Sequence, residues 1–415
     1  MDYSGKRVLV LGSGVSGIGA ASVLRALKAN VTVCDTDSLP DLNGFDIAVV
    51  SPGIPPDHYV FNELRRLCIS IMSDIGLGAE LNTAPVTAIT GTNGKTTTVE
   101  MLGRIYSEAG IRAAVCGNIG VSFAERAYKG GYDRAVLELS SFQLLNASPL
   151  KAHIACILNI TPDHLDYHGD MRSYSRSKLK ISDRQTPDDF LFVPKDLDIS
   201  GMCGSAEVLR EGVDFYADEY ITVAGKRIMR TAEVGARGLH NLQNALFAAA
   251  AAYADGVNEQ VICKALSGFR TGEHRISLVG EYNGTCFYDD SKGTNPGATV
   301  AAAECMSGSV ALIAGGSDKG IDYSYLFGRL PENVVAVYLT GDNAARMASA
   351  AEREGRYAVT VCDTLRECIQ LCGRGGYDCV LFSPASASFD RYKNYAERGK
   401  FFEREVGFLI SGTDR

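Results

Sequence analysis

The stretch VTAITGTNGKTTT, residues 86–98, decides the fold of the central part of this chain. An apolar, β-prone run ends in a Gly/Asn turn at residues 91–94, and Lys95 then opens a helical pattern. A strand, a glycine-rich loop and a helix N-terminus form a cradle for phosphate, because backbone N–H groups and the helix dipole are directed at the anion. Lys95 adds a mobile cation, and the hydroxyl of Thr96 can reach Mg²⁺. The stretch therefore predicts nucleotide phosphate binding.

The match to the P-loop pattern G-x-x-x-x-G-K-[ST] is not strict. Ile89 stands where the pattern requires its first glycine, and the nearest glycine is Gly91. A purely structural turn is therefore the alternative to a phosphate cradle. We favour the cradle because this Gly-Lys-Thr follows a strand and opens a helix. The residues expected at the phosphates are Gly91, Thr92, Asn93, Gly94, Lys95, Thr96 and Thr97.

Length and charge limit the class of protein. A chain of 415 residues predicts roughly two to four domains. Its 41 Lys and Arg against 49 Asp and Glu give a net charge of −8, so no overall basic field favours nucleic acid. No apolar run reaches the ~20 residues of a membrane span, and residues 1–7 lack the apolar region of a signal peptide. The 12 cysteines are expected to be reduced core residues. We expect a cytoplasmic protein that neither binds nucleic acid nor inserts into membranes.

The first part of the chain carries a second glycine motif. A predicted strand at 7–11 leads into GSGVSG at 12–17, a helix follows, and a second strand at 31–35 ends in Asp35. This is a complete G-x-G-x-x-G between two strands, with an acid close to the spacing used for ribose. Taken alone it favours a dinucleotide, so an NAD-dependent dehydrogenase is a rival hypothesis. The segment before residue 85 is short for an NAD-binding domain, and we expect a helix N-terminus that binds some phosphate.

Further strands of the central part end in polar residues. They are predicted at 113–116, 135–138 and 152–158, and ligands bind at such strand ends in open parallel sheets. Glu138 at one strand tip is an expected Mg²⁺ ligand, with an N-cap or a buried pair as the alternative. The run NITPDHLDYH at 159–168 gathers acids and histidines. A site for Mg²⁺ and substrate oxygens fits this run better than zinc, because a third zinc ligand is not evident.

Two helices follow, with a β-rich excursion between them. The basic residues of the predicted helix at 172–182 are spread around its surface, and their spacing alone predicts a solvated face. Short alternating runs at 207–230 predict a small set of strands. An Ala-rich helix then begins near residue 238, and Asn241 and Asn244 on its first turn would face a ligand such as adenine or ribose. Ordinary N-capping is the alternative.

A linker at residues 269–276 leads to a third α/β part. Its strands are expected at 285–289, 311–314, 336–339 and 379–382. Lys292, Thr294, Lys319 and Ser388 follow strand ends, so they should meet at one edge of the sheet. Lysines and hydroxyls gathered in this way suit a substrate that bears a carboxylate.

The whole chain therefore reads as an α/β protein of three domains, each a mostly parallel sheet flanked by helices, the central one a P-loop-type ATPase domain. The chain resembles the Mur ligase family along nearly its whole length. The resemblance is carried by TGTNGKTT, the Asn-x-x-x-Asp-His run, the HN-x-x-N of the Ala-rich helix, the His-Arg linker and DSK-x-TN. Folylpolyglutamate synthases are similar more weakly. LELSSFQL at 137–144 and SPA-x-AS-x-D at 383–390 resemble the branch that adds D-glutamate to UDP-N-acetylmuramoyl-L-alanine.

This resemblance implies an ATP-dependent amide-bond ligase of peptidoglycan precursor synthesis that acts through an acyl phosphate, with two Mg²⁺ ions. It implies a UDP-substrate-binding domain at 1–84, an ATP-binding domain at 85–271 and an amino-acid-binding domain at 272–415. The diphosphate of UDP then replaces NAD at the first glycine motif, and we expect a monomer. A sibling ligase that uses another amino acid, and a Mur-like nucleotide-binding regulator without turnover, are the alternatives.

The resemblance also implies individual roles. The expected contacts of the UDP substrate are Ser13, Gly14, Val15, Ser16, Thr36, Gly53, Asn118, Ser140 and His164. ATP would be contacted, beyond the loop, by Asn241, Asn244, Arg275, Asp290 and Lys292. The amino acid would be held by Thr294, Lys319, Ser388 and Tyr395. The implied metal ligands are Thr96, Glu138, His164 and Lys178 as a carbamate, and the implied catalytic residues are Lys95, His164, Lys178 and Arg275.

Overall fold

The computed structural model describes residues 2–236, 238–270, 272, 274–318, 320 and 322–412. The chain divides into two compact units. The first is Met1–Ala236 with Asn241–Phe269, and the second is Arg237–His240 with Arg270–Arg415. The three larger sheets are parallel or mostly parallel and flanked by helices, which confirms the predicted fold class. The bounds of the three predicted domains stay a prediction.

The first sheet of unit one is small and parallel. Its strand order is β2-β1-β3-β4, with β1 Arg7–Leu11, β2 Asn30–Cys34, β3 Ile47–Val50 and β4 Ser70–Met72. Val8 and Val10 of β1 join the core cluster that contains helix α1 (Val15–Ala26). Leu9 and Leu11 join the cluster on the other face, which contains helix α2 (Tyr59–Arg66). Successive side chains of a strand point to opposite faces, so this apolar run is buried on both sides.

The central sheet has six parallel strands in the order β10-β9-β8-β5-β7-β6. The strands are β5 Val86–Thr90, β6 Ala113–Gly117, β7 Arg134–Glu138, β8 Ile154–Ile157, β9 Phe190–Val193 and β10 Glu207–Arg210. One face carries α4 (Lys95–Glu108), α9 (Leu239–Ala254) and α10 (Glu259–Ser267). The other carries α3 (Asp74–Leu81), α5 (Phe123–Lys129), α6 (Ser141–Leu144) and α8 (Met171–Leu179). Strand β5 is buried along its whole length, so the loop that follows it starts from the centre of the unit.

The predicted β-rich excursion is a three-stranded antiparallel sheet. It consists of β11 Phe215–Ala217, β12 Tyr220–Val223 and β13 Lys226–Arg230. Phe215 packs edge-on against Phe192 and Phe247, with ring centroids 5.3 and 5.0 Å apart. These aromatic contacts tie the small sheet to strand β9 and helix α9.

Unit two contains one six-stranded sheet in the order β14-β15-β19-β16-β17-β18. Its strands are β14 Ser277–Tyr282, β15 Thr285–Asp289, β16 Val310–Ala314, β17 Val334–Leu339, β18 Ala358–Val361 and β19 Cys379–Phe382. Strand β14 runs antiparallel to β15, and the other described strand pairs of this sheet are parallel. Helices α11 (Pro296–Ala303), α12 (Ser324–Arg329) and α13 (Ala344–Glu354) pack on one face. Helices α14 (Leu365–Arg374) and α15 (Tyr395–Ser411) pack on the other.

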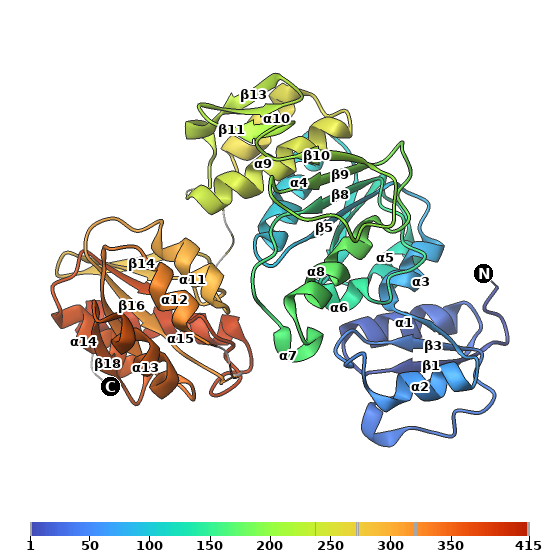
Figure 1. Ribbon diagram of the computed structural model, residues 1–415, viewed down its shortest axis with the longest axis horizontal. Coiled ribbons are helices and arrows are strands. Elements are labelled where there is room, and N and C mark those ends of the chain that lie inside the picture. The colour runs from blue at the N-terminus through green and yellow to red at the C-terminus, as the bar shows by residue number, and fades with distance from the viewer. Residues whose placement is uncertain are drawn as a thin grey trace. The chain divides into compact units, whose positions relative to one another are not determined.

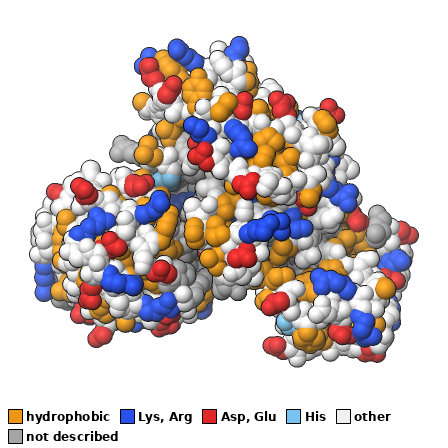
Figure 2. Space-filling view, viewed as in Figure 1, with side chains coloured by type: hydrophobic (Ala, Val, Ile, Leu, Met, Phe, Trp, Pro, Cys, Tyr) orange, Lys and Arg blue, Asp and Glu red, His pale blue; other side chains and the backbone are white. Residues whose placement is uncertain are grey.

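The surface carries charges of both signs. On the face shown in Figure 2, acidic and basic side chains are interspersed. None of the described helices combines the length and the apolar character that crossing a membrane requires.

Candidate active site

The polar loops of the central sheet meet at one edge. Strands β8, β5, β7 and β6 are parallel neighbours, so their carboxyl ends lie side by side. Strand β8 is followed by Asn159, β5 by the loop at 91–94 and β6 by Asn118, whereas Glu138 is the last residue of β7. Open parallel sheets bind ligands at this edge. The residues of the central sheet that were predicted to bind nucleotide and metal follow these strand ends.

The backbone of the loop requires glycine. Gly91 and Gly94 have φ angles of +154° and +83°, which residues with a Cβ rarely adopt. A Cβ on Gly94 would run into the side-chain amide of Asn244. Thr98 Oγ1 donates to the carbonyl of Gly94 at 3.0 Å and approaches Asn244 Oδ1 at 3.4 Å. Asn244 and Asn241 are both buried. Asn244 therefore packs against the phosphate loop on its buried side. Contact of these two residues with adenine stays a prediction.

Asn159 binds the loop from the neighbouring strand. Its Oδ1 accepts a hydrogen bond from the backbone N–H of Asn93 at 2.8 Å, and its Nδ2 donates to the carbonyl of Asn93 at 3.1 Å. The backbone N–H of Thr92 donates to the carbonyl of Asn159 at 2.9 Å. Asn159 therefore pairs with the backbone of Asn93 through both the oxygen and the nitrogen of its side-chain amide. Asn159 belongs to the 159–168 run, but no individual role was predicted for it, although an Asn directly after a buried strand was a visible signal.

Two lysines meet at one backbone carbonyl. Lys95 Nζ donates to the carbonyls of Gly91 and Thr92 at 2.9 and 2.8 Å, and Lys178 Nζ donates to Gly91 at 2.8 Å. The side chain of Lys178 is buried, with 1% of the residue exposed. Burial, together with the charge of Lys95, holds the pKa of Lys178 well below its ordinary value, and Asp163 only partly opposes this. The solvated face predicted from helical spacing is therefore wrong for Lys178.

Tyr174 links Lys178 to the loop. Lys178 Nζ lies 4.6 Å from the centre of the Tyr174 ring, and the Tyr174 hydroxyl is 3.1 Å from Thr92 Oγ1. Thr92 Oγ1 also accepts from the backbone N–H of Thr161 at 3.0 Å. Burial raises the pKa of Tyr174, so it stays a neutral phenol. Helix α8, the loop after β5 and the loop after β8 are thus joined around one buried amine.

Glu138 has one satisfied and one unsatisfied carboxylate oxygen. Its Oε1 accepts from Asn118 Nδ2 at 2.8 Å, whereas its buried Oε2 has no hydrogen-bond partner within the described part of the chain. An unpaired buried carboxylate oxygen is costly, and it is the hard ligand that Mg²⁺ prefers. The residues here fit a divalent cation. The nearby Ser140 hydroxyl accepts from the backbone N–H of Gln143 in a capping box, which gives it a local role as well.

The histidines of the 159–168 run have different surroundings. His164 adopts a left-handed φ of 53°, and its ring lies 4.8 Å from that of Phe142. His168 is stacked on Phe142, and its Nε2 lies 2.9 Å from Ser141 Oγ. Among the described side chains, the one group of three possible ligands close enough for a metal ion is His274, Asp289 and Glu403. That group includes neither His164 nor His168, so nothing here favours the zinc alternative.

In the first glycine motif, the acidic residue Asp35 bonds the loop of the motif itself. Asp35 accepts hydrogen bonds from the backbone N–H and the hydroxyl of Ser13 at 3.0 and 3.1 Å. The acid that the dehydrogenase hypothesis assigns to ribose is therefore bonded to the glycine loop itself. Gly14 stands at the N-cap of α1 without a side-chain cap, followed by the exposed Val15 and the partly exposed Ser16.

Two other residues expected at the UDP substrate lie at the ends of β2 and β3. Thr36 begins a short 3₁₀ turn, Thr36–Ser38, after β2. Gly53 lies in the loop after β3, where a Cβ would meet no atom within 4 Å. The Tyr167 hydroxyl donates to the carbonyls of Pro52 and Ile54, at 3.2 and 2.9 Å, on either side of Gly53. The 159–168 run therefore reaches the loop that follows β3.

In unit two, the loops after β15 and β19 are held by Arg398. This buried guanidinium donates to the carbonyls of Ser291, Ser386 and Ala387 at 3.0, 2.9 and 3.2 Å. Burial lowers its pKa to about 10, so it stays charged at neutral pH. The two loops carry the expected residues Asp290, Lys292, Thr294 and Ser388.

The other expected residues of unit two have fewer described contacts. Lys292 Nζ lies 5.4 Å from the Tyr395 ring centre. Burial raises the pKa of Asp290 to about 7, although a hydrogen bond from Ser383 and the charge of Arg275 oppose the rise. Lys319 lies outside the described residues.

A nucleotide-binding α/β enzyme is the class that this fold and this loop define. Two family models match the chain: the Mur ligase middle domain over residues 89–252, and the Mur ligase, glutamate ligase domain over residues 274–386. A protein of Thermoanaerobacter pseudethanolicus named UDP-N-acetylmuramoylalanine--D-glutamate ligase is 35% identical, over 99% of this chain and 100% of that protein. A protein of the same name from Koribacter versatilis is 36% identical, over 98% of each chain.

A solved structure supports the fold. The crystal structure of MurF from Acinetobacter baumannii matches 99% of this chain and 91% of that one, with a TM-score of 0.63 and 21% identity. The chain belongs to the Mur ligase family.

The pairing of Asn159 with Asn93 leads to a test. We expect Asn159→Ala to raise the KM for ATP roughly 10-fold or more, because losing both bonds frees the phosphate-binding N–H groups from their positions. Asn82→Ala is the matched control. The oxygen and the nitrogen of the Asn82 side-chain amide pair in the same way with the backbone of Ala84, which lies near the opposite end of β5. Steady-state ADP release measures both variants, and an unchanged KM for ATP in Asn159→Ala would contradict the positioning role.

Proposed function

We propose that this chain joins D-glutamate to UDP-N-acetylmuramoyl-L-alanine, with cleavage of ATP to ADP and phosphate, in the synthesis of peptidoglycan precursors. The observation that carries this proposal is that relatives with this activity in their name match the chain end to end at about 35% identity. The phosphate loop between Gly91 and Lys95, with its buried lysine and half-satisfied carboxylate, supports the ATP-dependent step. Cytoplasmic location and a monomeric state stay predictions.

The chemistry follows from the weak electrophilicity of a carboxylate. The terminal carboxylate of the UDP substrate attacks the γ-phosphorus of ATP, a new O–P bond forms, and ADP leaves with the electrons of the broken bond. The amine of D-glutamate then attacks the carbonyl carbon of this acyl phosphate. Collapse of the tetrahedral intermediate expels inorganic phosphate, and the ammonium proton is lost to leave the amide. Charge neutralisation at the transferring phosphoryl group is the main contribution expected of the protein.

The residues of the chain divide this work. Lys95 and Arg275 neutralise charge on the transferring group, and the N–H groups of the loop hold the phosphates. Thr96, Glu138, His164 and carbamoylated Lys178 would hold two Mg²⁺ ions, which supply charge neutralisation when bound. Asn241 and Asn244 would lie on the adenine side, with Asp290 and Lys292 on the ATP side of unit two.

Binding of the other substrates would use the ends of the outer strands. The start of α1, residues 13–16, would face the UDP diphosphate, and Thr36, Gly53, Asn118, Ser140 and His164 would contact the rest of that substrate. Thr294, Lys319, Ser388 and the backbone of Tyr395 would hold D-glutamate. Closure of the units around the substrates would keep water from the acyl phosphate.

The carbamate on Lys178 is supported by its burial. Burial and the charge of Lys95 lower the pKa of Lys178, which favours the neutral, nucleophilic form of its amine. Attack of the neutral amine on CO₂ forms an N–C bond, breaks one C–O π bond and releases one proton, so that a neutral amine becomes an anion. A buried anion beside Lys95 pairs with its charge, whereas the unmodified ammonium repels it.

We expect Lys178→Ala to lose most of the ligase activity and to regain part of it with a small added carboxylate such as acetate. The carboxylate would replace the missing anion in the cavity left by the side chain. Lys180→Ala is the matched control, because Lys180 lies two residues along the chain with 43% of its side chain exposed. Full activity of Lys178→Ala without added carboxylate would rule out the carbamate.

ADP release with UDP-N-acetylmuramoyl-L-alanine, measured across D- and L-amino acids, tests the proposed function. We expect D-glutamate to exceed L-glutamate and the other amino acids by at least roughly 100-fold in kcat/KM, as expected for a site that hydrogen-bonds its substrate. A preference for another amino acid would identify a sibling ligase. ATP binding without turnover on any of them would identify a regulator.

A further inference from the structure

Asn343 stands at the start of a helix and does not cap it. It is the N-cap residue of α13, where an Asn side chain ordinarily accepts a hydrogen bond from the backbone N–H two or three residues later. Among the described residues, Asn343 makes no such bond. The residue is fully buried, at 0% exposure. Its amide is therefore committed to other partners.

Those partners come from two other loops. Asn343 Oδ1 accepts from the backbone N–H of Gly316 at 2.8 Å, and the Asn343 backbone N–H donates to the Gly316 carbonyl at 3.2 Å. Asn343 Nδ2 donates to the hydroxyls of Tyr323 and Ser386, both at 2.6 Å. These two hydroxyls lie 3.1 Å from each other. The amide thus uses its acceptor and both of its donor hydrogens, all with buried partners.

The three loops follow β16, β17 and β19 and pack backbone against backbone. A Cβ on Gly341 would lie 2.6 Å from the Gly316 nitrogen, and a Cβ on Gly315 would run into the Thr340 carbonyl. The Ser317 N–H donates to the carbonyl of Ala387 at 2.9 Å. At such contacts, a shift of one loop moves the next, because no space remains to absorb it.

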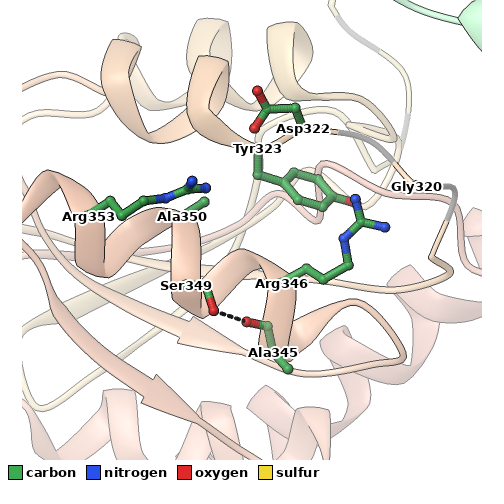
Figure 3. A pocket seen from close by; sticks show the side chains of 8 residues that line it. All are labelled: Gly320, Asp322, Tyr323, Ala345, Arg346, Ser349, Ala350 and Arg353. Atoms are coloured by element: carbon green, nitrogen blue, oxygen red, sulfur yellow. Dashed lines mark hydrogen bonds between the residues drawn. The ribbon is translucent and has the colours of Figure 1, made fainter.

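Tyr323 separates this network from an outer pocket. Its ring lines a pocket of ≈ 410 Å³, together with Arg346, Ser349 and Arg353 of α13. Figure 3 shows the Tyr323 ring beside the side chain of Arg346. The Tyr323 hydroxyl accepts from Asn343 Nδ2 and lies 3.1 Å from Ser386 Oγ. Tyr323 is itself buried, so the network is closed to water on this side.

We propose that Asn343 is a positioning residue for the amino-acid substrate, an inference that rests on the proposed function. It fixes the loop at residues 315–318 to the loop that carries Ser388. Ser388 is one of the residues expected to hold D-glutamate. Asn343 acts through this loop and touches no reacting atom.

The proposal predicts a selective effect on one substrate. Asn343→Ala should raise the KM for D-glutamate about 10-fold or more, with the KM for ATP and for the UDP substrate within about 3-fold of wild type. Asn343→Asp should restore the KM, because a carboxylate accepts from Gly316 N–H and from both hydroxyls once their hydrogens rotate. Asn333→Ala is the matched control, since Asn333 bonds the Met306 carbonyl at the opposite end of β17.

Steady-state kinetics on the full chain, with each substrate varied in turn, decide the matter. An unchanged KM for D-glutamate in Asn343→Ala, or an equal loss toward all three substrates, would overturn the proposal. Tyr323→Phe, which removes one hydroxyl and keeps the ring, should shift the same KM in the same direction if Asn343→Ala fails to fold. The KM of each variant is divided by the wild-type KM for whichever amino acid the wild type uses. If the wild type prefers an amino acid other than D-glutamate, the proposed function is wrong, but the positioning role of Asn343 can still be tested with that amino acid.

Discussion

The carbonyl of Gly91 is the constraint on which the phosphate loop depends. It accepts from both Lys95 and Lys178. A left-handed backbone aims this carbonyl at the two amines, and a buried strand delivers it to the sheet edge. Lys178 is held there against a large desolvation cost, which is visible in its depressed pKa. The lowered pKa favours the neutral form of this buried amine, which is nucleophilic. Its neighbours Tyr174, Thr92 and Asn159 keep the loop in place around it.

The same arrangement recurs at the first sheet of unit one and at the six-stranded sheet of unit two. In each, apolar strands buried on both faces fix a row of carboxyl ends, and polar side chains bond the loops that follow. Asp35 bonds the glycine loop after β1, Asn159 bonds the loop after β5, and Arg398 and Asn343 bond the loops of unit two. The groups expected to touch substrates therefore rest on an inner set of polar residues that hold backbone atoms.

Much of this could be predicted from the sequence. The strands β1, β5, β7 and β16 are short apolar runs with turn signals behind them, and their strand-end residues were expected at one edge for that reason. Edge strands β14 and β18 were not predicted, because they are only partly buried and their patterns are weak. Helix α3 was also missed, and its buried glycines are poor helix formers.

Side-chain partners could not be predicted, since they come from residues distant in the sequence. Helical spacing placed Lys178 on a solvated face, whereas the Gly91 carbonyl, 87 residues earlier, draws it inward. Asn343, for which nothing was predicted, stands at the N-cap position of α13, yet Gly316 and Ser386 bond its amide. Asp35 reads as a ribose ligand, yet it bonds Ser13. In each case tertiary contacts decide what the polar residue does.

In the proposed function, the phosphate loop delivers a phosphoryl group to a substrate carboxylate. This step can be tested by labelling both oxygens of that carboxylate of UDP-N-acetylmuramoyl-L-alanine with ¹⁸O and analysing the released phosphate by mass spectrometry. An acyl phosphate predicts that one labelled oxygen passes into each molecule of inorganic phosphate while the amide keeps the other. Unlabelled phosphate formed alongside the amide product would contradict the account.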